Sequence, residues 1–154
     1  MAAAALDRAL ARNPNAARAW SARGIIHAVR NEPEAAIEAI ERARRLSPFD
    51  PNASVGYAAN IAVAHLVARR FEQAIEWADR ALHDQPRLVG AMRIKVVANA
   101  HLGRLDEARA ELSRMLAIDP ELTIADFRDL AHYLAPEVLG LYIAGLRLAG
   151  LPEG

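Results

Sequence analysis

Histidine is the side chain of this 154-residue sequence best suited to bind a metal or to transfer protons at neutral pH. There are five of them: His27, His65, His83, His101 and His132. None lies in an HExxH motif or four residues before another histidine, as in His-x3-His, so no metal-ligand spacing is present. The sequence has no cysteine, which excludes disulfides, thiolate zinc sites and a cysteine nucleophile. We therefore expect no metal site, and packed, partly buried imidazoles at His27 and His65.

Carboxylates could act as acids and bases, and they recur in two clusters: Glu34, Glu38 and Glu41, then Glu72, Glu76 and Asp79. Their three- and four-residue spacings, beside Arg42, Arg45 and Arg80, instead predict surface ion pairs on helices, worth ~0.2–0.5 kcal/mol each. The serines lack the context of a nucleophile elbow. The glycines Gly24, Gly56 and Gly90 occur singly, so no phosphate-binding loop can be written. These observations predict no enzymatic activity and no cofactor.

The charge balance restricts the partners. Lys+Arg 19 against Asp+Glu 19 gives zero formal charge, whereas nucleic-acid and membrane-surface binders need a basic excess. The longest apolar stretches, 54–66 and 138–148, are shorter than the ~20 residues that cross a bilayer. The apolar start is followed by Asp7 and Arg8, unlike a secretory signal, in which charge comes first. We expect a cytoplasmic protein with neither a nucleic-acid nor a membrane partner.

The elements that position these side chains form a repeat. Similar stretches begin at Glu34, Glu72 and Asp106, and each is followed at the same offset by a proline: Pro48, Pro86 and Pro120. The period is 34 residues between positions 74 and 108 and 38 between positions 36 and 74, with the extra residues assigned to the loop 48–52. Counting back from the first copy reaches Ala9 and Pro14, so the chain opens on the second half of a unit.

The sequence pattern of each unit predicts two helices. Apolar residues at three- and four-residue steps mark the helices, and proline or glycine ends them. Between the first two full helices, residues 31–34 offer Asn31 as a capping side chain, Pro33 for the first turn, and acids beside it. The predicted helices span 2–11, 15–30, 33–46, 53–68, 71–84, 88–102, 105–118, 122–130 and 136–149.

The repeat resembles the tetratricopeptide pattern, which the first unit meets at Trp20, Gly24, Ala36, Ile40, Ala43 and Pro48. Arg23 and His27 depart from that pattern. The resemblance implies an all-α fold, a right-handed superhelix of antiparallel helix pairs with about nine helices and a concave inner surface. It implies one array over residues 1–154: a half-repeat 1–14, repeats 15–52, 53–86 and 87–120, and a degenerate capping pair 121–154. Small residues such as Ala36 and Ala74 are expected where paired helices touch. A non-catalytic protein–protein interaction module is the expected function.

In this family the first helix of each unit lines the concave groove. Carried over by register, the tentative partner-binding groove contains Arg18, Ser21, Ile25, Val29, Ala59, Asn60, Val63, Leu66, Arg93, Val97 and His101. Members that bind chaperone tails hold a carboxylate with Lys and Asn, but here those places carry Ser21, Ile25, Gly90 and Ile94, and Asn60 alone matches. A mostly apolar groove predicts an amphipathic helix or an apolar peptide as ligand. The chain's own last helix could equally fill it, and some of these positions could simply be core.

The end helices raise an alternative, self-association. The first helix presents Ala3, Leu6 and Leu10 without a preceding partner, and the last offers a similar edge of Val138, Leu141, Tyr142, Leu146 and Leu148. Three short segments, 47–51, 116–123 and 145–152, are also similar to the C-terminal tetratricopeptide region of bacterial class III adenylate/guanylate cyclases and of winged-helix regulators. This implies the C-terminal regulatory part of a larger bacterial signalling protein, with any catalytic or DNA-binding domain outside this chain.

Overall fold

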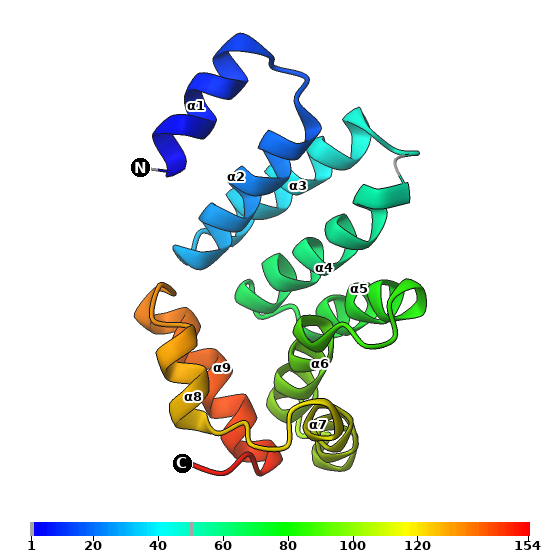
Figure 1. Cartoon of the computed structure of the whole chain (residues 1–154), viewed down its shortest axis with the longest axis vertical. Helices are drawn as coiled ribbons and strands as arrows, with labels where there is room; N and C mark the ends of the chain where they lie inside the picture. Colours follow the sequence, from blue (N-terminus) through cyan, green and yellow to red (C-terminus); the bar gives the residue numbers. More distant parts are fainter. Residues whose placement is uncertain (1, 50) are drawn as a thin grey trace.

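The computed structural model describes residues 2–49 and 51–154, and the side chains of these residues other than 51–55. Met1 of the predicted half-repeat and Asp50 of the segment 47–51 lie outside the described residues. Over the described ranges the regular elements are α-helices (Figure 1). They are α1 (Ala2–Arg12), α2 (Ala17–Val29), α3 (Pro33–Leu46), α4 (Pro51–Val67), α5 (Phe71–Asp84), α6 (Val89–His101), α7 (Leu105–Ile118), α8 (Ile124–Leu130) and α9 (Pro136–Ala149).

The repeat pattern located most of these helices correctly. The bounds of α3, α5, α7 and α9 agree with the predicted ones at both ends. The start of α8 differs, at Ile124 instead of residue 122, because Thr123 caps this helix: its hydroxyl accepts from the Asp126 N–H, and the Asp126 carboxylate accepts from the Thr123 N–H. Local capping chemistry decided this boundary.

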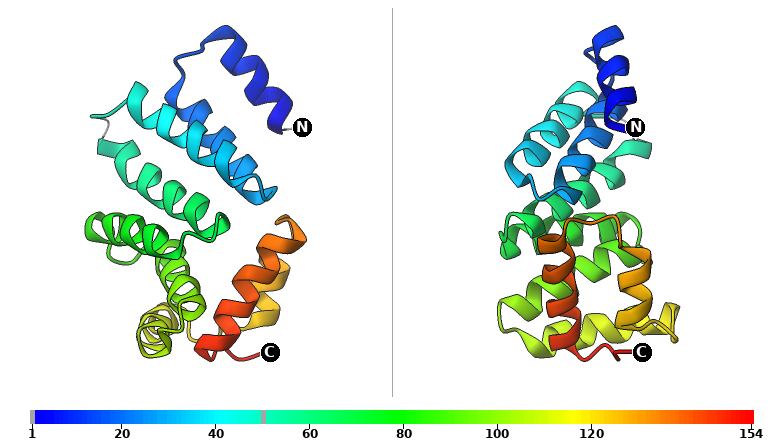
Figure 2. Two further views of the ribbon diagram at one scale, coloured as in Figure 1. Left: turned by 180° about the vertical axis from the view of Figure 1, so that it is seen from behind. Right: turned by 90° about the vertical axis from the view of Figure 1, so that its left-hand side faces the viewer.

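The helices pack as consecutive antiparallel pairs, α2 with α3, α4 with α5 and α6 with α7, and α4 and α6 also contact the preceding pair. The pairs stack along the long axis of the molecule, from α1 at one end to α7 and the C-terminus at the other (Figures 1 and 2). Alanines occupy the closest contacts, as the sequence predicted: the fully buried set includes Ala36, Ala43, Ala74, Ala81 and Ala108. The chain is therefore an all-α tetratricopeptide-like superhelix.

The turn inside each pair repeats, and here the predicted side-chain cap is wrong. Asn31, Arg69 and Gly103 each adopt a left-handed conformation, with φ of 63°, 60° and 78°. The next residue's N–H then reaches back five residues, as from Glu32 to the His27 carbonyl and from Arg104 to the Asn99 carbonyl, both at 2.9 Å. No side-chain cap bond is present at the start of α3, because Asn31 terminates α2 through its backbone instead.

Ion pairs also follow the repeat. Arg70 at the start of α5 pairs with Glu34 of α3, and Arg104 at the start of α7 pairs with Glu72 of α5. Arg80 and Glu76 form the predicted pair within one helix, with nitrogen and oxygen 2.6 Å apart. Two of the acids predicted to pair within a helix thus bridge successive units. All are solvent-exposed, so each contributes little to stability.

The last two helices turn back and cover the inner side of the third unit (Figure 1). A Cβ atom at Gly145 of α9 would lie 2.8 Å from the Cα of Val97 in α6, so a glycine is required for this approach. The N–H of Ala135, just before α9, donates to the carbonyl of Val29 at the end of α2, at 2.8 Å. The terminal pair therefore spans from α6 to α2 across the concave side.

This packing alters the two predicted end faces. Val138, Leu141, Tyr142 and Leu146 of α9 are buried in the core, so they do not form an open edge, and of that set Leu148 alone is exposed. On α1, Leu10 is also buried, whereas Ala3 and Leu6 are half-buried. The apolar surface available for self-association is thus smaller than the sequence suggested.

Candidate functional site

A pocket of about 280 Å³ lies on the concave side, between the first helices of the three units and the terminal pair. The first two units contribute five predicted groove residues to its wall: Ile25, Val29, Ala59, Asn60 and Val63. Each of these side chains is half-buried, so it is held by packing yet still reaches the pocket. The pocket is therefore a preformed and mostly apolar depression rather than a gap in the core.

Some of the predicted groove residues, mainly in the third unit, do not line the pocket. Arg93 lines the pocket, but Val97 and also Leu66 of α4 are fully buried and so are core residues rather than lining. His101 is enclosed: its ring stacks on Phe71 with centroids 5.1 Å apart, and its Nε2–H donates to the Leu141 carbonyl at 2.9 Å. The physical reason is that α9 packs on the inner face of α6, where the predicted groove would have placed a ligand.

The two polar positions at the far end behave differently from each other. Ser21 accepts a hydrogen bond from the Asn60 amide, with oxygen and nitrogen 2.9 Å apart, so it orients a lining residue without lining the pocket itself. Arg18 is exposed to solvent and is not part of the pocket wall. The structure thus brings together Ile25, Val29, Ala59, Asn60, Val63 and Arg93 of the predicted set.

The remaining wall comes from residues that the sequence analysis did not place in the groove. Phe127 of α8, Leu134 after it, and Tyr142 of α9 face the same pocket as Val63. The signal that could have indicated them is the apolar character of the last two helices combined with Gly145, a small residue where helices must meet. The repeat register alone could not have indicated these residues, because the terminal pair does not follow the repeat.

Arg93 is the charged side chain of this wall. Its guanidinium carbon lies 5.1 Å from the centre of the Phe127 ring, a cation–π contact, and its Nε is buried without a hydrogen-bond partner among the described residues. Burial lowers the pKa of the guanidinium, which the neighbouring Tyr142 partly opposes. Burial also raises the pKa of Tyr142 to about 12, so its hydroxyl stays protonated at neutral pH. The pocket therefore combines a mostly apolar wall with one half-buried positive charge.

A second pocket, of about 340 Å³, lies between α3, α4 and α5. Although this pocket is larger, two of the charged groups that line it already have partners. Arg44 pairs with Glu41 and Arg80 with Glu76, and both guanidinium groups stack on Trp77, with Arg80 4.2 Å from the ring centre. A ligand there would have to displace these contacts, so the concave pocket is the better candidate.

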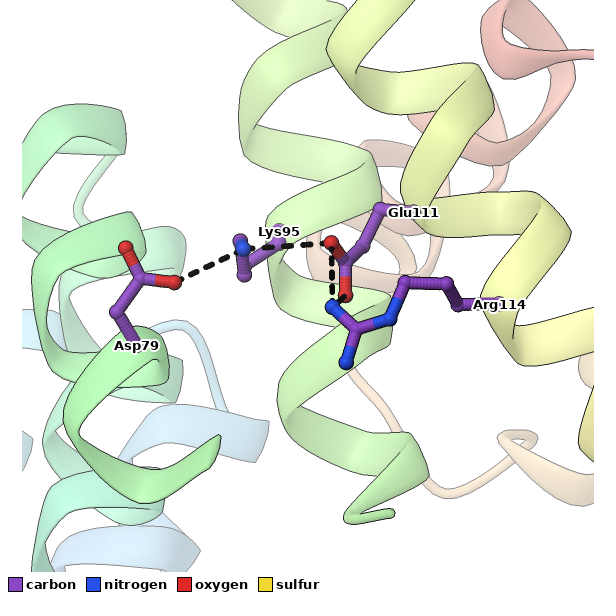
Figure 3. Close-up of polar contacts among 4 residues, drawn as sticks. All are labelled: Asp79, Lys95, Glu111 and Arg114. Carbon is purple, nitrogen blue, oxygen red and sulfur yellow. Dashed lines mark hydrogen bonds and ion pairs between the residues drawn. The ribbon is translucent and has the colours of Figure 1, made fainter. Parts of the chain in front are cut away.

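One further cluster of charges lies between α5, α6 and α7 (Figure 3). The Lys95 ammonium, from the single lysine of the chain, lies 2.8 Å from Asp79 and 3.3 Å from Glu111, and Arg114 lies 2.9 Å from Glu111. Glu111 is just 6% exposed. Burial alone would lower the pKa of Lys95, but the hydrogen bond to Asp79 and the charge of Glu111 together raise it. The cluster links three helices and leaves no acid free to act as a base.

We expect replacement of Lys95 by Met to destabilise the fold by ~2 kcal/mol, because the buried Glu111 keeps only Arg114 as a partner. Because the pKa of Lys95 is raised on folding, the stabilisation is present at neutral pH and is lost as the pH rises above ~10. Urea unfolding at pH 7 and at alkaline pH measures both effects. Arg109→Met, which breaks an exposed pair with Asp106, is the matched control and should cost under ~0.5 kcal/mol. Equal losses in the two variants would contradict the role of Lys95.

Within the described part of the chain, no three His, Asp or Glu side chains are grouped so as to hold a metal ion. None of the described helices has both the length and the apolar character needed to cross a membrane.

Comparison with known proteins gives matches to one family. A sequence model described as "Tetratricopeptide repeat" matches residues 2–51 and 59–122, well over half of the chain. The human protein "FK506-binding protein-like" is 36% identical over 110 residues, which cover 68% of this chain and 31% of that protein. Its rat counterpart is 34% identical over 94 residues, covering 58% and 27%.

Among solved structures, the Arabidopsis OM64 TPR domain superposes with a TM-score of 0.62 at 22% identity, over 76% of this chain and 91% of that domain. This likeness shows the fold. The chain spans about a third of the length of the curated relatives it matches. The narrower resemblance to bacterial cyclase and regulator tails is not tested by these matches and stays a prediction.

Proposed function

The chain belongs to the tetratricopeptide repeat family, and we propose from this premise that it is a non-catalytic protein-interaction module whose concave pocket binds a segment of a partner protein. One observation supports the proposal above others. Helices from three successive units and the terminal pair converge on a single pocket, and its wall is mostly apolar and includes half-exposed side chains. Half-exposed apolar side chains in a preformed depression gain free energy when a partner covers them.

The dimensions of the pocket restrict how a partner binds. A volume of about 280 Å³ lies at the lower end of the range for ligand pockets, ~300–1,000 Å³. The terminal pair already covers the inner face of the third unit, so a whole helix does not fit beside α6. The partner therefore lies across the pocket mouth and inserts a few anchoring side chains, as a peptide or as one face of a helix.

Replacement of Val63 by Asp should weaken this binding strongly and leave the fold intact. Val63 is half-buried in the pocket wall, so a carboxylate there stays hydrated in the free protein but must be desolvated beneath a bound apolar side chain. We expect peptides selected from a random library on the full chain to bind Val63→Asp at least ~10-fold more weakly, a loss of ~1.4 kcal/mol or more. Calorimetry measures the affinity, and circular dichroism checks the helix content.

The matched control is Ile75→Asp. Ile75 is a half-buried aliphatic residue of α5 that packs on the core but does not line the pocket. The Ile75→Asp variant should bind the selected peptides with unchanged affinity. Peptides that bind the Val63 variant and the wild type equally well would overturn the pocket as the partner site.

Self-association is a second candidate, favoured by large apolar side chains that stay exposed on the terminal pair. Leu130 and Tyr133 near the end of α8 are 69% and 66% exposed, and Leu148 of α9 is 52% exposed. We expect light scattering to show a fraction of dimer that rises with protein concentration. The Leu130→Glu variant should form less dimer at the same concentration. A strict monomer at the highest concentration tested would reject this candidate.

In either case we propose that residues 1–154 act as one array with the unit boundaries given above, in a larger bacterial signalling protein.

A further inference from the structure

We propose that the concave pocket binds an acidic side chain of the partner segment, Asp or Glu, and that Arg93 is the residue that pairs with it. The proposal rests on the proposed function, since it takes the pocket as the partner site. It adds the chemistry of the ligand: a carboxylate on a side chain, flanked by apolar residues.

Arg93 has no anionic partner in the part of the chain that the structure describes. A guanidinium carries five N–H donors, and several other arginines of this chain, such as Arg70, Arg104 and Arg147, direct theirs to carboxylates. Among the described residues, Arg93 makes a contact with the Phe127 ring, and its Nε is buried without a hydrogen bond. No Asp or Glu occurs among the described residues that line the pocket. The charge is thus held in place but not neutralised.

Arg93 is half-buried, and its buried Nε lacks a hydrogen bond among the described residues, which is unfavourable. A charge-assisted pair with a planar carboxylate is among the strong polar contacts available to arginine. Tyr142 lines the same pocket, close enough for its charge state to respond to Arg93, and its hydroxyl remains protonated. It can therefore donate to the same carboxylate. Binding an acid relieves a cost that is already present in the free protein.

The carboxylate of the partner could come from a side chain or from a chain terminus. To bring its terminal carboxylate to Arg93, a peptide would have to place backbone N–H and C=O groups against Ile25, Val29 and Leu134, which offer them no hydrogen bonds. A Glu or Asp side chain presents the same carboxylate on methylene carbons, which suit an apolar wall. The pocket therefore favours the side chain.

The test is selection of random peptides on the full chain, displayed with both ends blocked so that side chains are the sole source of carboxylates. We expect Asp or Glu to be enriched at one position beside apolar residues. Exchange of that Glu for Gln in a selected peptide should weaken binding about tenfold on the wild type and have no further effect on Arg93→Gln. Arg87→Gln, which removes an exposed arginine outside the pocket, is the matched control and should leave affinity unchanged.

The outcomes separate this inference from the proposed function. Peptides that lose affinity on Val63→Asp, but show no acid preference and bind Arg93→Gln as tightly as the wild type, overturn the role of Arg93 and leave the pocket standing. Peptides indifferent to Val63→Asp, or a library without binders, contradict both. Binders found solely in a second library whose C-terminus is free would show that the side-chain assignment is wrong. If Arg93→Gln does not fold, the exchange of Glu for Gln in the peptide on the wild type decides alone.

Discussion

Replacement of Val97 by Asp should destabilise the fold by ~4 kcal/mol, although the repeat register places this residue on the concave groove. Val97 is fully buried, and Gly145 of α9 approaches its backbone so closely that a Cβ atom would lie 2.8 Å from its Cα. An aspartate there would be a buried charge without a partner, which costs several kcal/mol. Urea unfolding followed by circular dichroism measures the loss.

The comparison with Val63→Asp makes this result informative. Both residues belong to first helices and to the predicted groove, but Val63 is half-exposed in the pocket whereas Val97 lies beneath the terminal pair. The structure therefore predicts a folding defect for Val97→Asp and a binding defect for Val63→Asp. If both variants unfold at the same urea concentration as the wild type, α9 does not cover α6 and the groove is open.

The second large effect is expected for Gly24→Ala in α2, a net destabilisation of ~2–3 kcal/mol. A Cβ atom at this position would lie 2.3 Å from Cγ1 of Ile40 and 3.0 Å from the carbonyl oxygen of Ala36. Ile40 is fully buried in α3 and cannot move away without disturbing the core. Alanine gains ~1 kcal/mol in helix propensity over glycine, which is too little to offset the clash.

Two variants control this prediction. Gly140 lies inside α9, and a Cβ atom there would meet nothing within 4 Å. Gly140→Ala should therefore stabilise the protein by ~0.5–1 kcal/mol through propensity alone. Ile40→Ala removes the clashing atoms, so the double variant with Gly24→Ala should be more stable than the sum of the single effects. An increase in the unfolding midpoint for Gly24→Ala would contradict the close packing of α2 on α3.

The helices could be predicted from the sequence because their signals are local and repeat. Prolines and apolar spacing placed both ends of α3 and α5, and the alanines at positions 36 and 74 marked where the pairs touch. The cap at Asn31 could not be predicted correctly, because asparagine serves equally as a capping side chain and as a left-handed residue that ends a helix. The hydrogen bonds of the surrounding turn decide between the two.

The site was predictable in part, for a different reason. Register placed Ile25, Val29 and Val63 on one concave face, because equivalent helices of a repeat face the same way. The last helix of the chain was one of the occupants predicted for that groove. Register could not place the residues of α8 and α9 there, since the terminal pair departs from the repeat and its position depends on long-range packing. The residues contributed by that pair, Phe127 and Tyr142, give the pocket its wall around Arg93.

If a partner segment lies in the concave pocket between α2, α4, α6 and the terminal pair, methyl chemical-shift mapping of the full chain should locate it there. On titration with a selected peptide, we expect the largest shifts at Ile25, Val29, Val63 and Leu134, which line that pocket. Shifts concentrated instead at the Ala58 methyl, in the pocket between α3, α4 and α5, with Val63 unchanged, would contradict this placement.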